Sequence, residues 1–166
     1  YQRRNHFIRK LTLDLKGNTL VLYNYVEKHG KPLYENIKQY SDDKERKIFF
    51  VSGNTPANDR EAIRMIVEKQ KNAIIVASLG TFSTGINIRN LHNIVFASPS
   101  KSQIRVLQSI GRGLRKTDDG KDTTLYDIVD DISWKSRKNY GILHADERLR
   151  IYGREKFMHK TYKVQL

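Results

Sequence analysis

The sequence predicts an α/β protein built on an open, mainly parallel sheet with helices on both faces. Short runs rich in β-branched residues alternate with segments of helical composition along the 166 residues. Several of these runs, such as residues 73–77, are apolar throughout, which is typical of strands covered on both faces. Strand and helix follow one another in turn, as right-handed crossovers between parallel strands require.

Five strands and four helices are expected in chain order. The expected strands are 19–23, 47–51, 73–77, 93–97 and 123–127. The expected helices are 27–40, 56–71, 101–116 and 133–151. Two of these helices have N-terminal signals. Thr55-Pro56 is typical of an N-cap followed by proline at the first helical position, and Ser100 with Gln103 forms a capping box.

The composition narrows the functional classes. The chain has 31 Lys and Arg against 18 Asp and Glu, a formal net charge of +13, and no cysteine. Without cysteine it has neither a disulfide framework nor a thiolate zinc site, which favours a reducing, cytoplasmic setting. The five histidines lack metal-ligand spacing, so we expect no metal site. No apolar run is long enough to cross a bilayer.

The positive charge is concentrated in three segments. Residues 1–16 carry five bases and one acid, residues 101–116 carry five bases and no acid, and residues 132–166 carry nine bases and three acids. Such clustering is typical of a protein that holds phosphates at particular places, and it favours a nucleic-acid partner. A charge that serves solubility alone is the alternative interpretation.

The expected helix over residues 101–116 carries the most specific pattern. With 3.6 residues per turn, apolar side chains gather on one stripe and polar side chains on another. The polar stripe consists of Arg105, Gln108, Arg112 and Arg115. Gly111 and Gly113 break ordinary helix preferences, which happens mostly where function or close packing demands it. Arginine fits phosphate oxygens with a planar fork, although a solvated basic face is the simpler interpretation.

Three motifs resemble those of the superfamily 2 helicases and translocases. The run Gln108–Arg115 is similar to their motif VI, Q-x-x-G-R-x-x-R. Residues 77–87 resemble motif V, and residues 19–24 resemble motif IV. Their order and spacing match the second RecA-like lobe of that superfamily. The resemblance covers residues 17–132, the expected RecA-like lobe. We expect a basic linker or interlobe segment over 1–16 and a basic helical extension packed on the lobe over 133–166.

The resemblance also implies the catalytic residues. In these motors ATP lies between two RecA-like lobes, and the second lobe directs arginines at the γ-phosphate. Arg115 would then be the arginine finger, with Arg112 beside it and Gln108 in the interlobe network. An ion pair between Arg112 and an acid such as Asp127 or Asp130 is the alternative.

The motif V segment would contact both nucleotide and DNA. By resemblance, Gly85 and Asn87 lie near ATP together with the two arginines, and Ser78 and Thr81 touch the DNA backbone. The family often has aspartate where this chain has asparagine, which weakens the expected contact of position 87. A polar connection between strand and helix is the alternative interpretation. Weaker candidates for phosphate contacts, at the ends of two other strands, are Asn24, Gly53 and Asn54.

The C-terminal segment mixes cations with aromatic side chains. Such a mixture can stack bases and follow phosphates, so Lys135, Arg137 and Lys138 are candidate DNA contacts. A helix that closes the sheet and buries Trp134 and Leu143 in the core is an equally simple interpretation.

The chain lacks the G-x-x-x-x-G-K-[ST] loop that cradles nucleotide phosphates. With the resemblance, this indicates the C-terminal motor lobe of an ATP-dependent DNA helicase that remodels branched DNA in recombination and replication. We expect a preceding N-terminal lobe of the same polypeptide to hold most of the ATP and Mg²⁺, and this chain to be inactive without it. The expected partners are that lobe and single-stranded or branched DNA. A non-enzymatic nucleic-acid-binding module on the same fold is the alternative.

Overall fold

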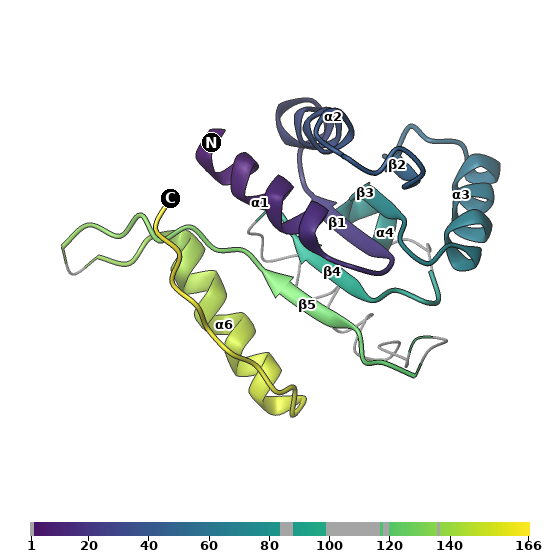
Figure 1. The fold of residues 1–166 in the computed structure, drawn as a ribbon. Coiled ribbons are helices and arrows are strands. Elements are labelled where there is room, and N and C mark those ends of the chain that lie inside the picture. Colours follow the sequence, from purple (N-terminus) through teal and green to yellow (C-terminus); the bar gives the residue numbers. More distant parts are fainter. Residues whose placement is uncertain (1, 84–87, 99–116, 118–119, 136) are drawn as a thin grey trace.

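The structure is a computed structural model that describes residues 2–83, 88–98, 117, 120–135 and 137–166. Within this part of the chain, five strands form one sheet in the order β2-β3-β1-β4-β5, and every pairing is parallel (Figure 1). The strands are β1 (Thr19–Tyr23), β2 (Ile48–Val51), β3 (Ile74–Ser78), β4 (Asn93–Phe96) and β5 (Thr124–Asp127). The predicted fold class is confirmed, and each strand lies within one residue of its predicted bounds.

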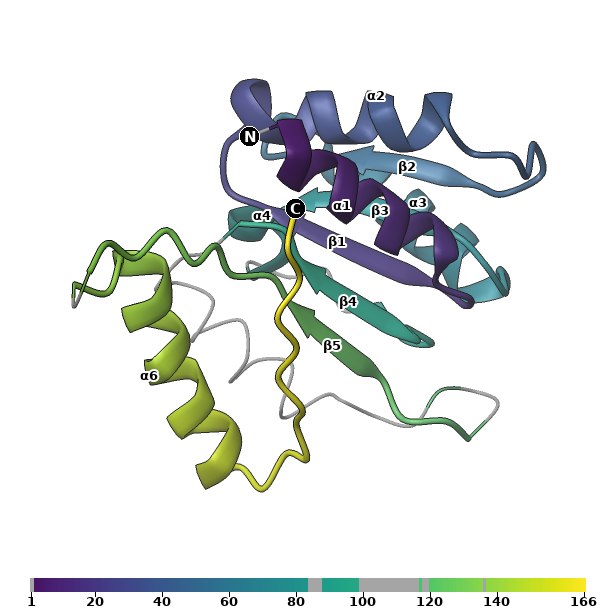
Figure 2. The ribbon, with the colours of Figure 1, turned by 60° about the vertical axis from the view of Figure 1, so that its left-hand side comes forward.

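Helices cover both faces of the sheet (Figures 1 and 2). On one face, α1 (Gln2–Asp14) and α2 (Lys31–Gln39) bury side chains such as Ile8 and Leu33 against β1, β3 and β4. A short π-helical turn, η1 (Val26–Gly30), leads into α2. On the other face, α3 (Ala57–Lys69), α4 (Leu79–Ser83) and α6 (Tyr140–Arg154) contribute to a second apolar cluster.

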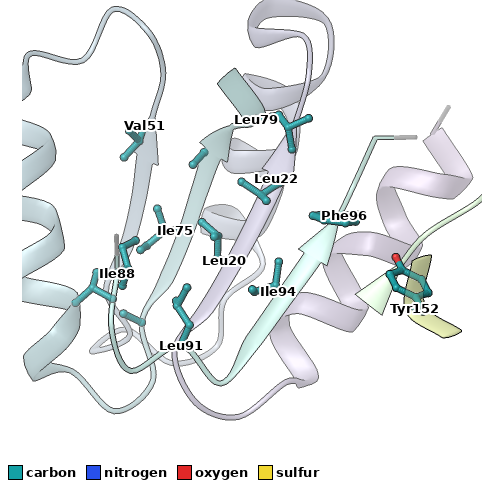
Figure 3. Packing of buried hydrophobic residues seen from close by; sticks show 13 residues of the cluster. Leu20, Leu22, Val51, Ile75, Leu79, Ile88, Leu91, Ile94, Phe96 and Tyr152 are labelled. Carbon is teal, nitrogen blue, oxygen red and sulfur yellow. The ribbon is translucent and has the colours of Figure 1, made fainter. Parts of the chain in front are cut away.

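The central strands are buried because both faces are covered. β1, β3 and β4 are buried along their whole length, whereas the edge strands β2 and β5 are partly exposed. Leu20, Leu22, Ile75, Ile94 and Phe96 line the second cluster (Figure 3). Parallel strands need such double cover, and their nearly continuous apolar sequences reflect it.

Residues 1–16, expected to be a basic linker or interlobe segment, contain a helix that packs on the sheet. Arg4, Ile8 and Thr12 are its buried residues, at the spacing of one helical face. Phe7 and Leu11 pack beside the buried cluster. The cations of this segment dominate its composition and obscure its narrow apolar stripe, so the sequence analysis does not predict this helix.

One predicted N-cap and one predicted helix start are wrong. Thr55 does not cap α3: its hydroxyl accepts a hydrogen bond from the Ser52 N–H (3.0 Å), and the helix begins after Pro56. α6 begins at Tyr140 and not at residue 133, because a hairpin turn occupies the residues before it. The expected helix over 101–116, with its capping box, lies outside the described residues.

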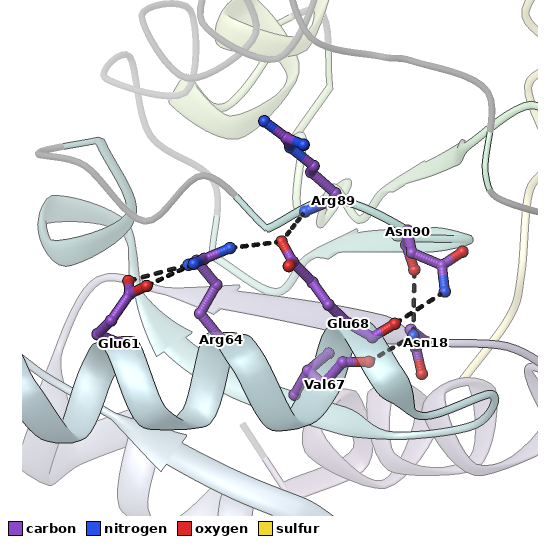
Figure 4. Close-up of polar contacts among 7 residues, drawn as sticks. All are labelled: Asn18, Glu61, Arg64, Val67, Glu68, Arg89 and Asn90. Carbon is purple, nitrogen blue, oxygen red and sulfur yellow. Dashed lines mark hydrogen bonds and ion pairs between the residues drawn. The ribbon is translucent and has the colours of Figure 1, made fainter.

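Asn18 fixes the edge of the sheet at which the strands begin. Its buried amide nitrogen donates to the carbonyls of Val67 (3.0 Å), Gln70 (2.7 Å) and Asn90 (3.1 Å), and its oxygen accepts from the Ala73 N–H (2.9 Å). One side chain therefore joins the end of α3 to the segments before β3 and β4. Figure 4 shows its contacts with Val67 and Asn90, beside the Glu61–Arg64–Glu68 ion pairs of α3.

We predict that Asn18→Ala lowers the free energy of unfolding by about 3 kcal/mol, because it leaves buried donors and acceptors without partners. Urea denaturation measures this loss. The control is Asn36→Ala in α2, whose side chain bonds only within its own helix turn, to the Pro32 carbonyl. Equal losses in the two variants would show that Asn18 does not act as a clamp.

Candidate functional site

The candidate site lies along the edge of the sheet at which the parallel strands end. In open α/β sheets, ligands bind outside the carboxyl ends of the strands because the connecting segments converge there. The described segments that leave these ends are 24–25 after β1, 52–55 after β2, 79–83 after β3, 97–98 after β4 and 128–130 after β5.

The turn after β3 holds the two hydroxyls predicted to touch DNA. Ser78 Oγ and Thr81 Oγ1 lie 2.5 Å apart, and the Thr81 N–H also donates to Ser78 Oγ (3.3 Å). Both side chains are buried, so they stabilise the start of α4. Gly80 between them is exposed, and a Cβ at this position would meet nothing within 4 Å. A partner can therefore approach the backbone of this turn at Gly80.

The turn after β2 presents two of the predicted phosphate contacts to solvent. The Thr55 N–H donates to the Ser52 carbonyl (3.0 Å), and the Asn54 N–H donates to the Ser52 hydroxyl (3.3 Å). Gly53 and Asn54 are exposed at the tip of this closed turn. They are accessible to a large partner without rearrangement of the turn.

The ends of β1 and β4 are joined by a buried pair that the sequence did not reveal. His29 of η1 lies with Nδ1 2.8 Å from Ser98 Oγ, and the backbone N–H of Asn24 donates to the same hydroxyl (3.4 Å). The pKa of His29 is lowered to about 4, mainly by burial and then by the nearby charge of Arg4, while the Asp130 carboxylate opposes the shift. His29 is therefore neutral at pH 7. The single histidine in a helical segment carried no motif that could have identified it.

An ion pair fastens α1 to the segment after β5. The buried Arg4 guanidinium has its Nε 3.1 Å from an Asp130 carboxylate oxygen, and its Nη2 donates to the Ile128 carbonyl (3.4 Å). One cation of the N-terminal basic cluster is thus used inside the lobe.

A second buried arginine fastens α6 to the end of β5. Arg148 is fully buried and donates from Nε and Nη2 to the two carboxylate oxygens of Asp127 (2.6 and 2.9 Å). The Tyr152 hydroxyl donates to the same carboxylate (2.8 Å), and burial followed by the Asp127 charge raises the pKa of Tyr152. The two acids considered as partners of Arg112 therefore have other arginine partners, Arg148 and Arg4.

The segment between β5 and α6 does not bury Trp134. Trp134 and Arg137 face each other across a tight hairpin, with backbone hydrogen bonds of 3.2 and 3.0 Å in the two directions. The Trp134 side chain is 76% exposed and Leu143 is 44% exposed, so the interpretation that placed both in the core is wrong. Lys135, Arg137 and Lys138 are all exposed, and the Lys138 ammonium lies 2.7 Å from an Asp146 oxygen.

The remaining predicted site residues, Gly85, Asn87, Gln108, Arg112 and Arg115, lie outside the described residues. In the part of the chain that is described, no group of His, Asp and Glu side chains is arranged to hold a metal ion. No helix there is long and apolar enough to span a bilayer.

Comparisons with known proteins agree with these motifs. Residues 3–117 match the family described as helicase conserved C-terminal domain. The chain is 36% identical over 177 aligned residues to the ATP-dependent DNA helicase UvsW of Enterobacteria phage T4, covering 99% of this chain and 34% of that protein. It therefore spans about a third of the length of this relative.

Solved structures show the same relationships. The crystal structure of T4 UvsW matches with a TM-score of 0.73 and 36% identity over 93% of this chain and 33% of that chain. The C-terminal part of the Fun30 ATPase domain matches with a TM-score of 0.56 over 94% of this chain and 55% of that chain. Its sequence identity is 14%, so this second likeness concerns the fold alone.

We predict that His29 makes the stability of the chain depend on pH. Its folded pKa of about 4 lies below the ordinary 6.5, so the unfolded chain takes up the proton first on acidification. Neutral His29 contributes about 3 kcal/mol to the free energy of unfolding. The contribution is complete above pH 6.5 and is lost as the pH falls towards 4.

Urea denaturation at several pH values, comparing the chain with His29→Gln, isolates this contribution from the titration of carboxylates. The variant should lose stability less steeply between pH 6.5 and 4. The exposed His159 in a His159→Gln variant is the control, with an expected profile like that of the unchanged chain. Parallel profiles for the chain and His29→Gln would contradict the prediction.

Proposed function

This chain belongs to the helicase conserved C-terminal domain family, and from that premise we propose that it is the second, RecA-like motor lobe of an ATP-dependent DNA helicase. The observation that carries the proposal is the identity over nearly the whole chain to a DNA helicase that extends well beyond it. The parallel sheet supports it independently, because its carboxyl edge gathers the motif V turn and two other polar turns.

The catalytic part of the proposal concerns motif VI. Arg115 would stabilise the charge that develops on the transferred phosphoryl group, with Arg112 beside it and Gln108 linking the two lobes. An arginine supplied in this way accelerates hydrolysis by about 10³- to 10⁵-fold. Gly85 and Asn87 would border the nucleotide. ATP and Mg²⁺ would be held mainly by the preceding lobe, since this chain has no P-loop.

The DNA-binding part concerns the turns at the carboxyl edge. Gly53 and Asn54 are exposed after β2, Asn24 is half-buried after β1, and Gly80 leaves the turn between Ser78 and Thr81 open to a partner. Exposed backbone amides and small polar side chains contact phosphates without reading sequence. We place the DNA backbone along these turns, with Lys135 and Arg137 as further cationic contacts.

The ion pairs of the two buried arginines fit a lobe that moves as one body. Arg4–Asp130 ties α1 to the segment after β5, and Arg148–Asp127 ties α6 to β5 itself. ATP would close the two lobes on a strand of DNA, and hydrolysis would reopen them. Because α1 and α6 are fastened to the sheet, they would move with it as the lobes close and reopen, and their packing would not change.

The intact enzyme would act on DNA inside a bacterial cell. We propose that the intact enzyme acts on single-stranded or branched DNA during recombination and replication. Its partners would be this DNA and the N-terminal RecA-like lobe of the same polypeptide. Because the relative is a phage protein, we place the enzyme in the cytoplasm of a bacterial host.

We predict that Arg115→Ala in the intact polypeptide lowers DNA-stimulated ATP hydrolysis by about 10³-fold or more, because the transition state loses its arginine. Phosphate release at saturating ATP measures the effect. Arg150→Ala, at an exposed position of α6, is the control and should keep the original rate. A normal rate in Arg115→Ala would remove the assigned role. An absence of ATPase in the unchanged polypeptide would favour a non-enzymatic binding module.

We predict that Lys135→Gln with Arg137→Gln flattens the salt dependence of single-stranded DNA binding. Each lost phosphate contact should reduce the slope of log K against log [salt] by about 0.7, hence about 1.4 for the pair. Fluorescence anisotropy of a labelled oligonucleotide gives the slope. Lys138→Gln should change it less, because Asp146 already balances that ammonium. Identical slopes for the double variant and the unchanged chain would exclude these contacts.

A further inference from the structure

The connection between β5 and α6 is a hairpin that stands away from the body of the lobe. We call residues 132–135 and 137–139 the β5–α6 hairpin. In Figures 1 and 2 its described residues extend away from the sheet, beyond the start of α6. Two backbone hydrogen bonds between Trp134 and Arg137 close it, and Lys135 adopts a φ of 53° in the left-handed region. The backbone at Trp134 and Arg137 is thus held together by both hydrogen bonds.

The base of this hairpin is fastened to the lobe on both sides. The Asn139 side chain donates to the Asp130 carbonyl (2.9 Å), and the Asn139 N–H donates to the Ser133 hydroxyl (3.3 Å). Lys138 is paired with Asp146 of α6. These contacts bring the two ends of the hairpin together and fix the direction in which its tip points.

The tip carries a large apolar side chain in solvent. Trp134 is 76% exposed, and Ile132 beside it is also 76% exposed. Indole is normally covered in a folded protein, so a fixed turn that holds it outside the core indicates a surface for a ligand. Residues 132–138 contain three cations and no acid. Lys135, Arg137 and Lys138 all have exposed side chains, and Lys138 is paired with Asp146.

The exposed indole and the cations beside it indicate which kind of ligand would bind here. A face of indole stacks on a planar base whatever its sequence, while neighbouring cations bind the phosphates on either side of that base. Bases inside a duplex are already stacked on each other, so only an unpaired base can offer its face. A nonpolar protein partner would need no cations around the indole, and an acidic partner would need no exposed indole.

We propose that Trp134 is a stacking site for an unpaired DNA base, with Lys135 and Arg137 at the adjacent phosphates. The proposal rests on the proposed function, because it identifies single-stranded DNA as the form that this part of the motor lobe holds. In the enzyme, the hairpin would retain a base exposed at the junction between single-stranded and duplex DNA.

Trp134 is the sole tryptophan of the chain, so fluorescence excited at wavelengths that tyrosine does not absorb reports on this side chain alone. The experiment titrates the 166-residue chain with two oligonucleotides of equal length, one of thymidines and one of abasic sites with the same phosphates. Anisotropy of a label on each oligonucleotide measures binding separately. We expect both to bind at low salt, and only the base-bearing oligonucleotide to quench Trp134 and shield it from acrylamide.

Variants supply an independent measure. Trp134→Ala should weaken binding of the thymidine oligonucleotide by about 5- to 100-fold, the range for one lost stacked base. It should leave binding of the abasic oligonucleotide unchanged. Trp134→Phe, which keeps an aromatic face, should lose less. The control is Tyr40→Ala after α2, which removes another exposed aromatic ring and should change neither affinity. Circular dichroism of each variant confirms that the fold is retained.

The outcomes separate this proposal from the proposed function. Binding of both oligonucleotides with equal quenching or none would overturn the stacking site and leave the DNA-binding lobe intact. Binding of neither at low salt would overturn DNA contact by this lobe itself. If Trp134 in the intact polypeptide is already shielded from acrylamide before DNA is added, the hairpin docks on protein and the stacking proposal is also overturned.

Discussion

A sheet of parallel strands brings the carboxyl end of every strand to the same edge, and the arrangement of this molecule depends on that constraint. The turns after β1, β2 and β3 are far apart in the sequence. They become neighbours because β1 and β2 each pair in parallel with β3. The central position of β1 places Asn24 and the motif V turn on adjacent strands. No single turn would make a phosphate-binding surface, but the shared edge combines them.

The positive charge of the chain has two different uses. Arg4 and Arg148 are buried in ion pairs that attach terminal helices to the sheet, and Arg46 donates to the backbone carbonyls of Leu13, Leu15 and Asn72. These cations stabilise the lobe and are not available to a ligand. Lys135 and Arg137 are exposed on a projecting turn, where a phosphate can reach them. The net charge of the chain therefore exceeds the positive charge that is available on the surface to bind nucleic acid.

Much of the fold could be predicted because strands buried on both faces leave a strong pattern. The run from Ala73 to Ala77 is apolar throughout, which is typical of a strand covered on both faces. The alternation of strand and helix indicates an open sheet of parallel strands. Helix α1 was missed because four cations mask a stripe that needs few apolar residues. The predicted N-cap of α3 is wrong because the Thr55 hydroxyl closes the preceding turn, a local competition that the sequence alone does not resolve.

The candidate site was only partly predictable for a similar reason. Motifs located the carboxyl edge, but they do not say which hydroxyls pair with each other, as Ser78 and Thr81 do. His29 and Ser98 meet across 69 positions of sequence, and neither belongs to a pattern on its own. A core position for Trp134, on a helix that closes the sheet, is one alternative from the sequence. Its exposure depends on a hairpin closed by backbone hydrogen bonds, which leave no signature in residue type.

Hydrogen exchange of the intact polypeptide tests most directly whether the carboxyl edge is the working surface. Exchange would be compared with and without a non-hydrolysable ATP analogue and single-stranded DNA. The account predicts slower exchange in residues 24–30, 52–55 and 78–83, with little change at the opposite edge around residues 17–18, 72–73 and 92–93. Protection confined to that opposite edge, or no protection at either edge, would contradict it.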